Sequence, residues 1–122
     1  MNARNITVAL LLVTPLLAMA APPAKVSSGI LTDGEGMTLY TFDKDVAGDG
    51  KSVCNDACAT NWPPFYPKMG EVANGDYSLI TRDDGAVQWA YKGKPLYLWV
   101  KDKSPGEISG DGVNKVWHVV KP

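Results

Sequence analysis

The sequence predicts a mainly β protein: a small antiparallel sheet domain of two related halves, a hairpin plus a meander, with one short Cys-bearing helix. Residues 36–45 and 93–102 share Gly, Leu, Tyr, an aromatic residue, Lys and Asp at identical spacing, 57 positions apart, which indicates an internal repeat. Short β-branched and aromatic stretches alternate with clusters rich in Gly, Pro and Asp, as in strands joined by turns. About 102 residues follow position 20, which is enough for one domain with a modest core.

The first 20 residues have the features of a secretory signal peptide. Arg4 precedes an apolar run over 6–17, and the small residues Ala18 and Ala20 flank Met19 before the expected cleavage point. The apolar run is shorter than the ~20 residues of a membrane-spanning helix, so no transmembrane anchor is expected after its removal. We therefore expect a periplasmic or secreted protein with a flexible lead-in over 21–28 and a single β domain over 29–122.

The first half is predicted to hold one hairpin and the helix. Strands over 26–31 and 37–42 flank a Thr-Asp-Gly-Glu-Gly turn. A helix is expected over 52–61, with Ser52 as its cap, and Trp62 followed by Pro63 and Pro64 ends it.

The second half is predicted to form a three-stranded meander and a closing strand. Strands over 77–81 and 86–91 flank an Arg-Asp-Asp-Gly turn, and a third strand covers 95–100. A last strand over 116–120 contains Trp117, which stands at the end of its half as Trp62 does in the first.

The repeated motif places aromatic side chains on one strand face in both copies, because side chains alternate along a strand. The motif residues are Tyr40, Phe42, Asp45, Tyr97, Trp99 and Asp102. Asp45 and Asp102 close the copies, and each is expected to bind backbone amides of its own turn. Most of the rings should form the core; Trp62, Trp89 and Tyr91 are the candidate binding aromatics if any ring faces outward.

The two cysteines allow three interpretations. In a secreted chain, Cys54 and Cys58 most simply form one disulfide. Alternatively, both thiolates and the single histidine, His118, make a soft ligand set suited to copper(I). Free or redox-active thiols are the third interpretation.

Charge and motif content argue against several classes of function. Residues 21–122 carry 11 basic and 13 acidic side chains with interleaved signs, so no nucleic-acid track or polybasic patch is expected. A small hydrolase is the weakest hypothesis, because one histidine stands without a recognisable serine elbow and the acidic pairs fall in turns. Whether the protein is an enzyme stays open at this point, with a non-enzymatic role favoured.

Both copies fit the pattern Tyr-x-aromatic-x-x-Asp, and Cys54-x-x-x-Cys58 is followed by Trp62-Pro63-Pro64. Over nearly all of residues 21–122 the chain resembles the bacterial family of secreted or lipoprotein repeats that this motif describes. The resemblance implies repeat architecture and an extracytoplasmic location, and it supplies no catalytic residues. The chain departs from the family in lacking a lipobox cysteine. We expect an envelope binding module for an unknown protein partner or small ligand, without a cofactor; the alternative is a copper-handling or thiol redox protein.

Overall fold

The structure is a computed structural model that describes residues 21–122. The predicted signal peptide, residues 1–20, lies outside the described residues. In chain order the elements are β1 (Lys25–Ser27), β2 (Ile30–Thr32), β3 (Tyr40–Phe42), α1 (Ala57–Asn61), β4 (Tyr77–Thr81), β5 (Val87–Tyr91), β6 (Lys94–Pro95), the 3-10 turn η1 (Val113–Lys115) and β7 (Trp117–Val119). The predicted mainly β fold with one short Cys-bearing helix is confirmed.

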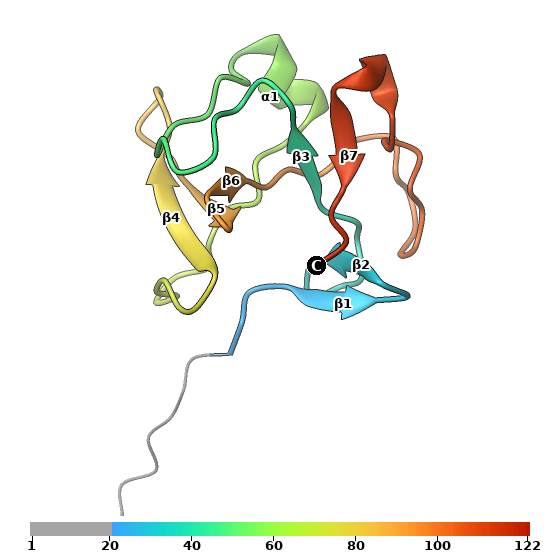
Figure 1. Cartoon of the computed structure of the whole chain (residues 1–122), viewed down its shortest axis with the longest axis horizontal. Helices are drawn as coiled ribbons and strands as arrows, with labels where there is room; N and C mark the ends of the chain where they lie inside the picture. Colours follow the sequence, from blue (N-terminus) through green and yellow to red (C-terminus); the bar gives the residue numbers. More distant parts are fainter. Residues whose placement is uncertain (1–20) are drawn as a thin grey trace, which may run out of the picture.

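The strands form three small antiparallel sheets, β1-β2, β3-β7 and β4-β5-β6. Figure 1 shows β4, β5 and β6 on one side of the molecule, β3 and β7 on the other, α1 at one end and β1-β2 at the opposite end. Within residues 21–122 no helix is long and apolar enough to cross a membrane.

The first hairpin differs from the prediction of one strand over 26–31. Ser28 and Gly29 have φ of 51° and 79°, the backbone of a tight two-residue turn, so the chain folds back and residues 25–27 form β1. Ala24 is buried beside it. The stretch predicted as a flexible lead-in over 21–28 therefore contributes a strand. The turn predicted after Leu31 is present, because Asp33 donates its amide to the Met37 carbonyl.

The helix is shorter than predicted. It covers only the last five residues of the expected 52–61 segment, and Ser52 does not cap it. The Ser52 hydroxyl instead turns inward, where it accepts a hydrogen bond from Arg82 at 2.9 Å. Asp56, with φ of 56°, interrupts the helical backbone before α1, and the helix stops before Trp62 as expected.

The meander of the second half is confirmed, but its third strand has only two residues. After Pro95 the chain leaves β5, and Tyr97 forms single bridges to Tyr40 and Pro64. The closing strand is present as β7, which pairs with β3 of the first half. Val100, the last residue of the predicted third strand, is 38% exposed because the strand has already ended at Pro95.

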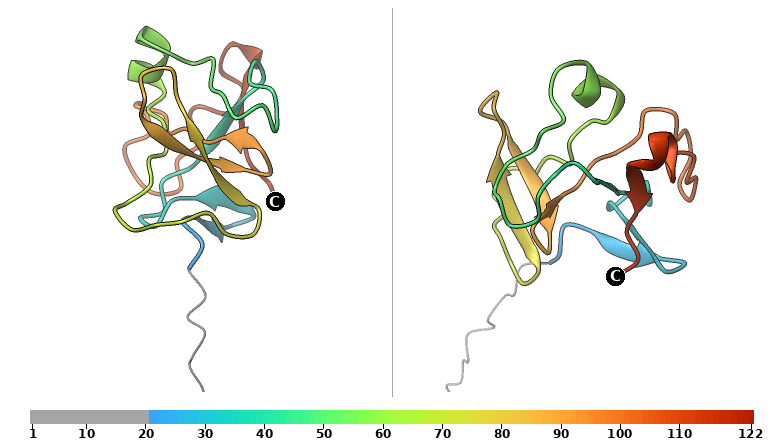
Figure 2. Two further views of the ribbon diagram at one scale, coloured as in Figure 1. Left: turned by 90° about the vertical axis from the view of Figure 1, so that its left-hand side faces the viewer. Right: turned by 45° about the horizontal axis from the view of Figure 1, so that its top comes forward.

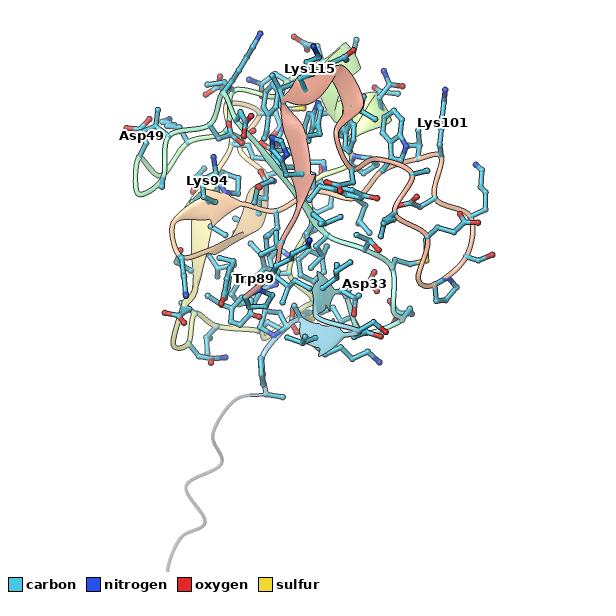
Figure 3. The ribbon with its side chains drawn as sticks, turned by 45° about the vertical axis from the view of Figure 1, so that its right-hand side comes forward. Asp33, Asp49, Trp89, Lys94, Lys101 and Lys115 are labelled. Atoms are coloured by element: carbon cyan, nitrogen blue, oxygen red, sulfur yellow. A yellow bond between two sulfur atoms is a disulfide. The ribbon has the colours of Figure 1, made fainter. Side chains whose placement is uncertain are left out.

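Two apolar clusters fill the interior. One consists of Tyr40, Phe42, Cys54, Trp62, Tyr97 and Trp117, and the other consists of Ala24, Leu31, Leu39, Trp89 and Leu96. In Figure 3 the labelled Trp89 lies inside the molecule, whereas Lys101 and Lys115 project from its surface. The right-hand view of Figure 2 shows the β4-β5-β6 sheet (yellow to orange) on one side of the molecule and β7 (red) on the other.

Candidate functional site

The two copies of the motif meet at Tyr40 and Tyr97. The Tyr40 amide donates to the Tyr97 carbonyl at 2.8 Å, and the Tyr97 amide donates to the Tyr40 carbonyl at 2.9 Å. Equivalent residues of the two repeats thus exchange equivalent bonds. The repeats are therefore related by an approximate two-fold axis between these tyrosines.

The glycine that opens each copy allows the other half to come close. The Gly36 carbonyl accepts from the Gly106 amide at 3.3 Å, and the Gly93 carbonyl accepts from the Gly48 amide at 3.0 Å. Both opening glycines have positive φ, 86° and 84°. A Cβ atom on Gly93 would lie 2.6 Å from the Gly48 nitrogen, so a side chain would clash with backbone there.

Each motif tyrosine is bound by the aspartate of the other copy. The Tyr40 hydroxyl donates to Asp102 Oδ2, and the Tyr97 hydroxyl donates to Asp45 Oδ2, both at 2.6 Å. The expectation that each aspartate binds only its own turn is thus incomplete. Asp45 Oδ1 accepts from the Val53 amide further along its loop, while Oδ2 reaches across to the other repeat. We call these two contacts the reciprocal Tyr–Asp locks.

The remaining aromatic residues form a four-ring stack in the order Phe42, Trp117, Trp62 and Trp99, with centroid distances of 4.2, 3.8 and 3.9 Å. Tyr40 meets Trp62 edge-on at 5.4 Å, and Tyr97 meets Trp117 edge-on at 5.1 Å. Each tryptophan near the axis contacts the tyrosine of its own half and the stacking ring of the other half. The motif aromatics therefore join the two repeats.

The locks lie in an environment that favours neutral side chains. Burial, and then the hydrogen bond to Asp102, raises the pKa of Tyr40 above its usual value of 10.0; burial and the bond to Asp45 do the same to the pKa of Tyr97. Burial also raises the pKa of Asp45, although the hydrogen bond from Tyr97 acts in the opposite direction. The tyrosines thus stay protonated donors over the physiological pH range.

A buried arginine extends one lock toward the disulfide. Arg82 is only 3% exposed. Its Nη1 donates to Ser52 Oγ at 2.9 Å and to Gln88 Oε1 at 2.7 Å. Its Nη2 donates to the Cys54 carbonyl. Ser52 Oγ lies 2.6 Å from the Tyr97 hydroxyl. The buried Nε of Arg82 has no hydrogen-bond partner among the described residues. Sequence reasoning missed this network.

A signal for part of that network was present in the repeat. Ser52 and Ser109 are also 57 positions apart, and each contacts a Tyr–Asp lock. Ser109 donates its amide and hydroxyl to Asp102 Oδ1 at 3.0 and 2.6 Å. Extending the repeat comparison past the motif aspartates would have selected both serines.

Cys54 and Cys58 form a disulfide with an S–S distance of 2.05 Å, as the first interpretation predicted. The copper alternative needs both sulfurs as thiolates, which this bond consumes. His118 Nε2 pairs with Asp43 Oδ2 at 2.8 Å at the surface. Among residues 21–122, no three His, Cys, Asp or Glu side chains are grouped so that they could hold a metal ion.

The three aromatic residues named as candidate binding groups do not form an outward platform. Trp62 is 4% exposed and Trp89 is 1% exposed, while Tyr91 is half-buried and packs on Tyr77. Both tryptophans belong to the core because the opposing repeat covers them. The four-ring stack is likewise almost covered: at the edge that includes Phe42 and Trp117, these rings are 7% and 2% exposed.

That edge borders a hollow of about 360 Å³, which we call the stack groove. It is lined by Phe42, Lys44, Cys58, Asn61, Trp62, Asn114, Val116 and Trp117. Residues of both repeats contribute, since the first five belong to the first half and the last three to the second. Lys44 is the only charged side chain in the lining, and the disulfide forms part of its wall.

Fold and site define a class of protein: a small β domain made of two repeats whose shared motif joins one copy to the other. A family model described as a secreted repeat of unknown function, Lipoprotein_15, matches residues 24–66 and 78–121, one copy for each half. The chain belongs to this family, as its motif residues predicted. Comparisons with curated proteins and with solved structures found no match.

Proposed function

We propose that this secreted repeat protein is a non-enzymatic binding module of the periplasm or the extracellular space, and that the stack groove is its binding site. The observation that carries the proposal is the composition of the groove, where three aromatic rings and a disulfide stand beside a single lysine. Concave sites lined by aromatic surface, with few charged groups, are typical of small-ligand binding.

The groove favours one ligand chemistry, a planar apolar group that carries a negative charge. Ring edges and the Cys58 sulfur offer polarisable apolar contact to a flat ligand. Lys44 supplies a cation at the rim that would pair with a carboxylate or sulfonate. Asn61 and Asn114 add amide groups that donate and accept hydrogen bonds.

A binding role also agrees with how the motif side chains are used. Both motif aspartates accept hydrogen bonds from tyrosines and from backbone amides, so their oxygens serve the fold. The acidic residues that the two copies of the motif share are therefore engaged inside the protein. Ligand recognition then falls to groove residues such as Lys44 and Val116.

The test is a titration of the folded protein with anilinonaphthalene sulfonate, an anionic aromatic dye, followed by amide chemical shifts in ¹⁵N spectra. We expect shift changes concentrated at Phe42, Lys44, Asn61 and Val116. Lys44→Ala should weaken binding about 2- to 5-fold, the size expected for one exposed ion pair. Lys51→Ala is the matched control, because Lys51 lies by Asp83 outside the groove.

Either of two results would contradict the proposal. The first is a set of shift changes that lies away from the groove, and the second is equal weakening by Lys44→Ala and Lys51→Ala. The same sample can be used to test the state of Cys54 and Cys58. The disulfide predicts no free thiol in the native protein and no copper(I) binding that depends on His118.

A further inference from the structure

The C-terminal segment of each repeat forms a backbone hydrogen bond with a strand of the other repeat. The Leu31 amide of the first half donates to the Val120 carbonyl at 2.9 Å, and the Trp89 amide of the second half donates to the Phe65 carbonyl at 2.8 Å. Val120 follows Trp117 by three positions, as Phe65 follows Trp62. Neither half therefore holds all the segments that cover its own core.

The two halves are connected by a lightly attached segment. Residues 67–77 lie between the two matched repeats. Met69 is fully exposed and Val72 is 59% exposed. Most hydrogen bonds of this segment are local: the Lys68 amide donates to Glu71 Oε1, and Asn74 and Tyr77 bond to each other through their backbones.

We propose that a second copy of this chain is a binding partner, and that the two copies exchange halves. Residues 24–66 of one copy pack on residues 78–121 of the other, and the connecting segments cross between the two units. Both Tyr–Asp locks, the Tyr40–Tyr97 pairing and the four-ring stack re-form between chains, because each needs residues from both halves. Exchange of identical elements in this way is a low-cost route to a dimer.

The exchanged dimer has a consequence for the stack groove. Lys44 and Cys58 of one chain would line it with Val116 and Trp117 of its partner copy. Each dimer then presents two complete grooves, and neither groove is complete without both chains. This inference does not depend on what the groove binds.

The connecting segment allows a direct test. Phe65 and Tyr77 lie on opposite edges of β5, since Phe65 bonds to Trp89 on the β6 side and Tyr77 pairs with Tyr91 through β4. Two strand spacings separate these edges by about 10 Å. After deletion of residues 67–76, Tyr66 alone would join Phe65 to Tyr77 and span at most about 7 Å.

The deletion variant should therefore be a dimer at every concentration in light scattering, with native-like tyrosine and tryptophan spectra. The wild-type chain refolded at about 0.5 mM should give a several-fold larger dimer fraction than at about 5 μM, and the dimer should persist on dilution. A folded monomeric deletion variant, or wild-type protein that stays monomeric after refolding at either concentration, would overturn the proposal.

A second experiment uses full-length chains and does not require the deletion variant to fold. One variant carries Tyr40→Phe with Asp45→Ala, and the other carries Tyr97→Phe with Asp102→Ala. Refolded together at high concentration, they should form a mixed dimer in which one unit has both locks intact and unfolds at the wild-type temperature. Each variant refolded alone is the control. If the unfolding curve of the mixture equals the sum of the curves of the two variants refolded alone, the exchange of halves is contradicted.

Discussion

Tyr40 and Tyr97 each place a hydroxyl against a carboxylate that belongs to the other repeat. Replacing either tyrosine with phenylalanine keeps the edge-on ring contact but leaves a buried aspartate oxygen without its donor. We expect each single change to lower the free energy of unfolding by about 1–3 kcal/mol, measured by urea denaturation.

The matched control for these two variants is Tyr66→Phe. Tyr66 is 49% exposed, so loss of its hydroxyl should change stability by less than about 0.5 kcal/mol. If Tyr40→Phe and Tyr97→Phe proved as harmless as this control, the locks would contribute nothing to the joining of the repeats.

The same tyrosines make stability sensitive to alkaline pH. Burial raises the pKa of both residues above 10.0 in the folded protein, so above pH 10 the unfolded chain loses two protons that the folded chain keeps. Stability must then fall as pH rises, by about 1.4 kcal/mol per pH unit for each tyrosine. Urea titrations between pH 10 and pH 11.5 should show this decrease, and Tyr97→Phe should remove the contribution of one tyrosine, while the raised pKa of Tyr77 adds to the decrease in both proteins. A stability independent of pH over this range would contradict the assignment.

At the scale of the elements, α1 and the loop before it depend on the disulfide. The bond closes a loop of only a few residues, which in the chain-entropy model stabilises the fold by about 2 kcal/mol. We expect Cys54→Ala with Cys58→Ala to lower the free energy of unfolding by about this amount and to leave the β-sheet circular dichroism unchanged.

Reduction of the wild-type protein with dithiothreitol serves as the control for that double variant and should produce the same shift. Complete unfolding on reduction would show that the disulfide holds the whole molecule together, not only α1. Cys54 also fixes Arg82 through its backbone carbonyl, so the effect of reduction should extend to the end of β4.

At the scale of the whole molecule, the junction between the repeats should tolerate lengthening. Inserting Gly-Ser-Gly-Ser after Met69 extends an exposed connection, which costs about 0.3 kcal/mol in loop-closure entropy. The same insertion after Gly48 should cost several times more, because the Gly48 amide bonds to Gly93 in the other half. Thermal unfolding of the two variants compares them, and equal losses would contradict this view of the junction.

The whole molecule also forms the stack groove, the binding site that we propose. The stack groove lies where the two repeats meet, and its lining comes from both. A single repeat has neither the locks nor the complete groove. Duplication of the motif therefore explains the site as well as the fold.

The sequence by itself determined the fold class, the repeat and the family, and it favoured the disulfide over the copper and free-thiol interpretations. These follow from local information: alternation of apolar residues, turn composition, and the spacing of Tyr40, Asp45 and Cys54 relative to Tyr97, Asp102 and Cys58. The boundaries of the short strands were less well defined. The Ser28-Gly29 turn and the shortened helix depend on backbone conformations that several residue types can adopt.

Only the tertiary structure decided whether each motif tyrosine bonds to the aspartate of its own copy or of the other copy. A repeated pattern is the same whether Tyr40 bonds to Asp45 of its own copy or to Asp102 of the other, since spacing carries no information about packing between copies. The burial of Trp62, Trp89 and Arg82 has the same origin. Contacts across the two-fold axis, rather than any local pattern, cover these side chains.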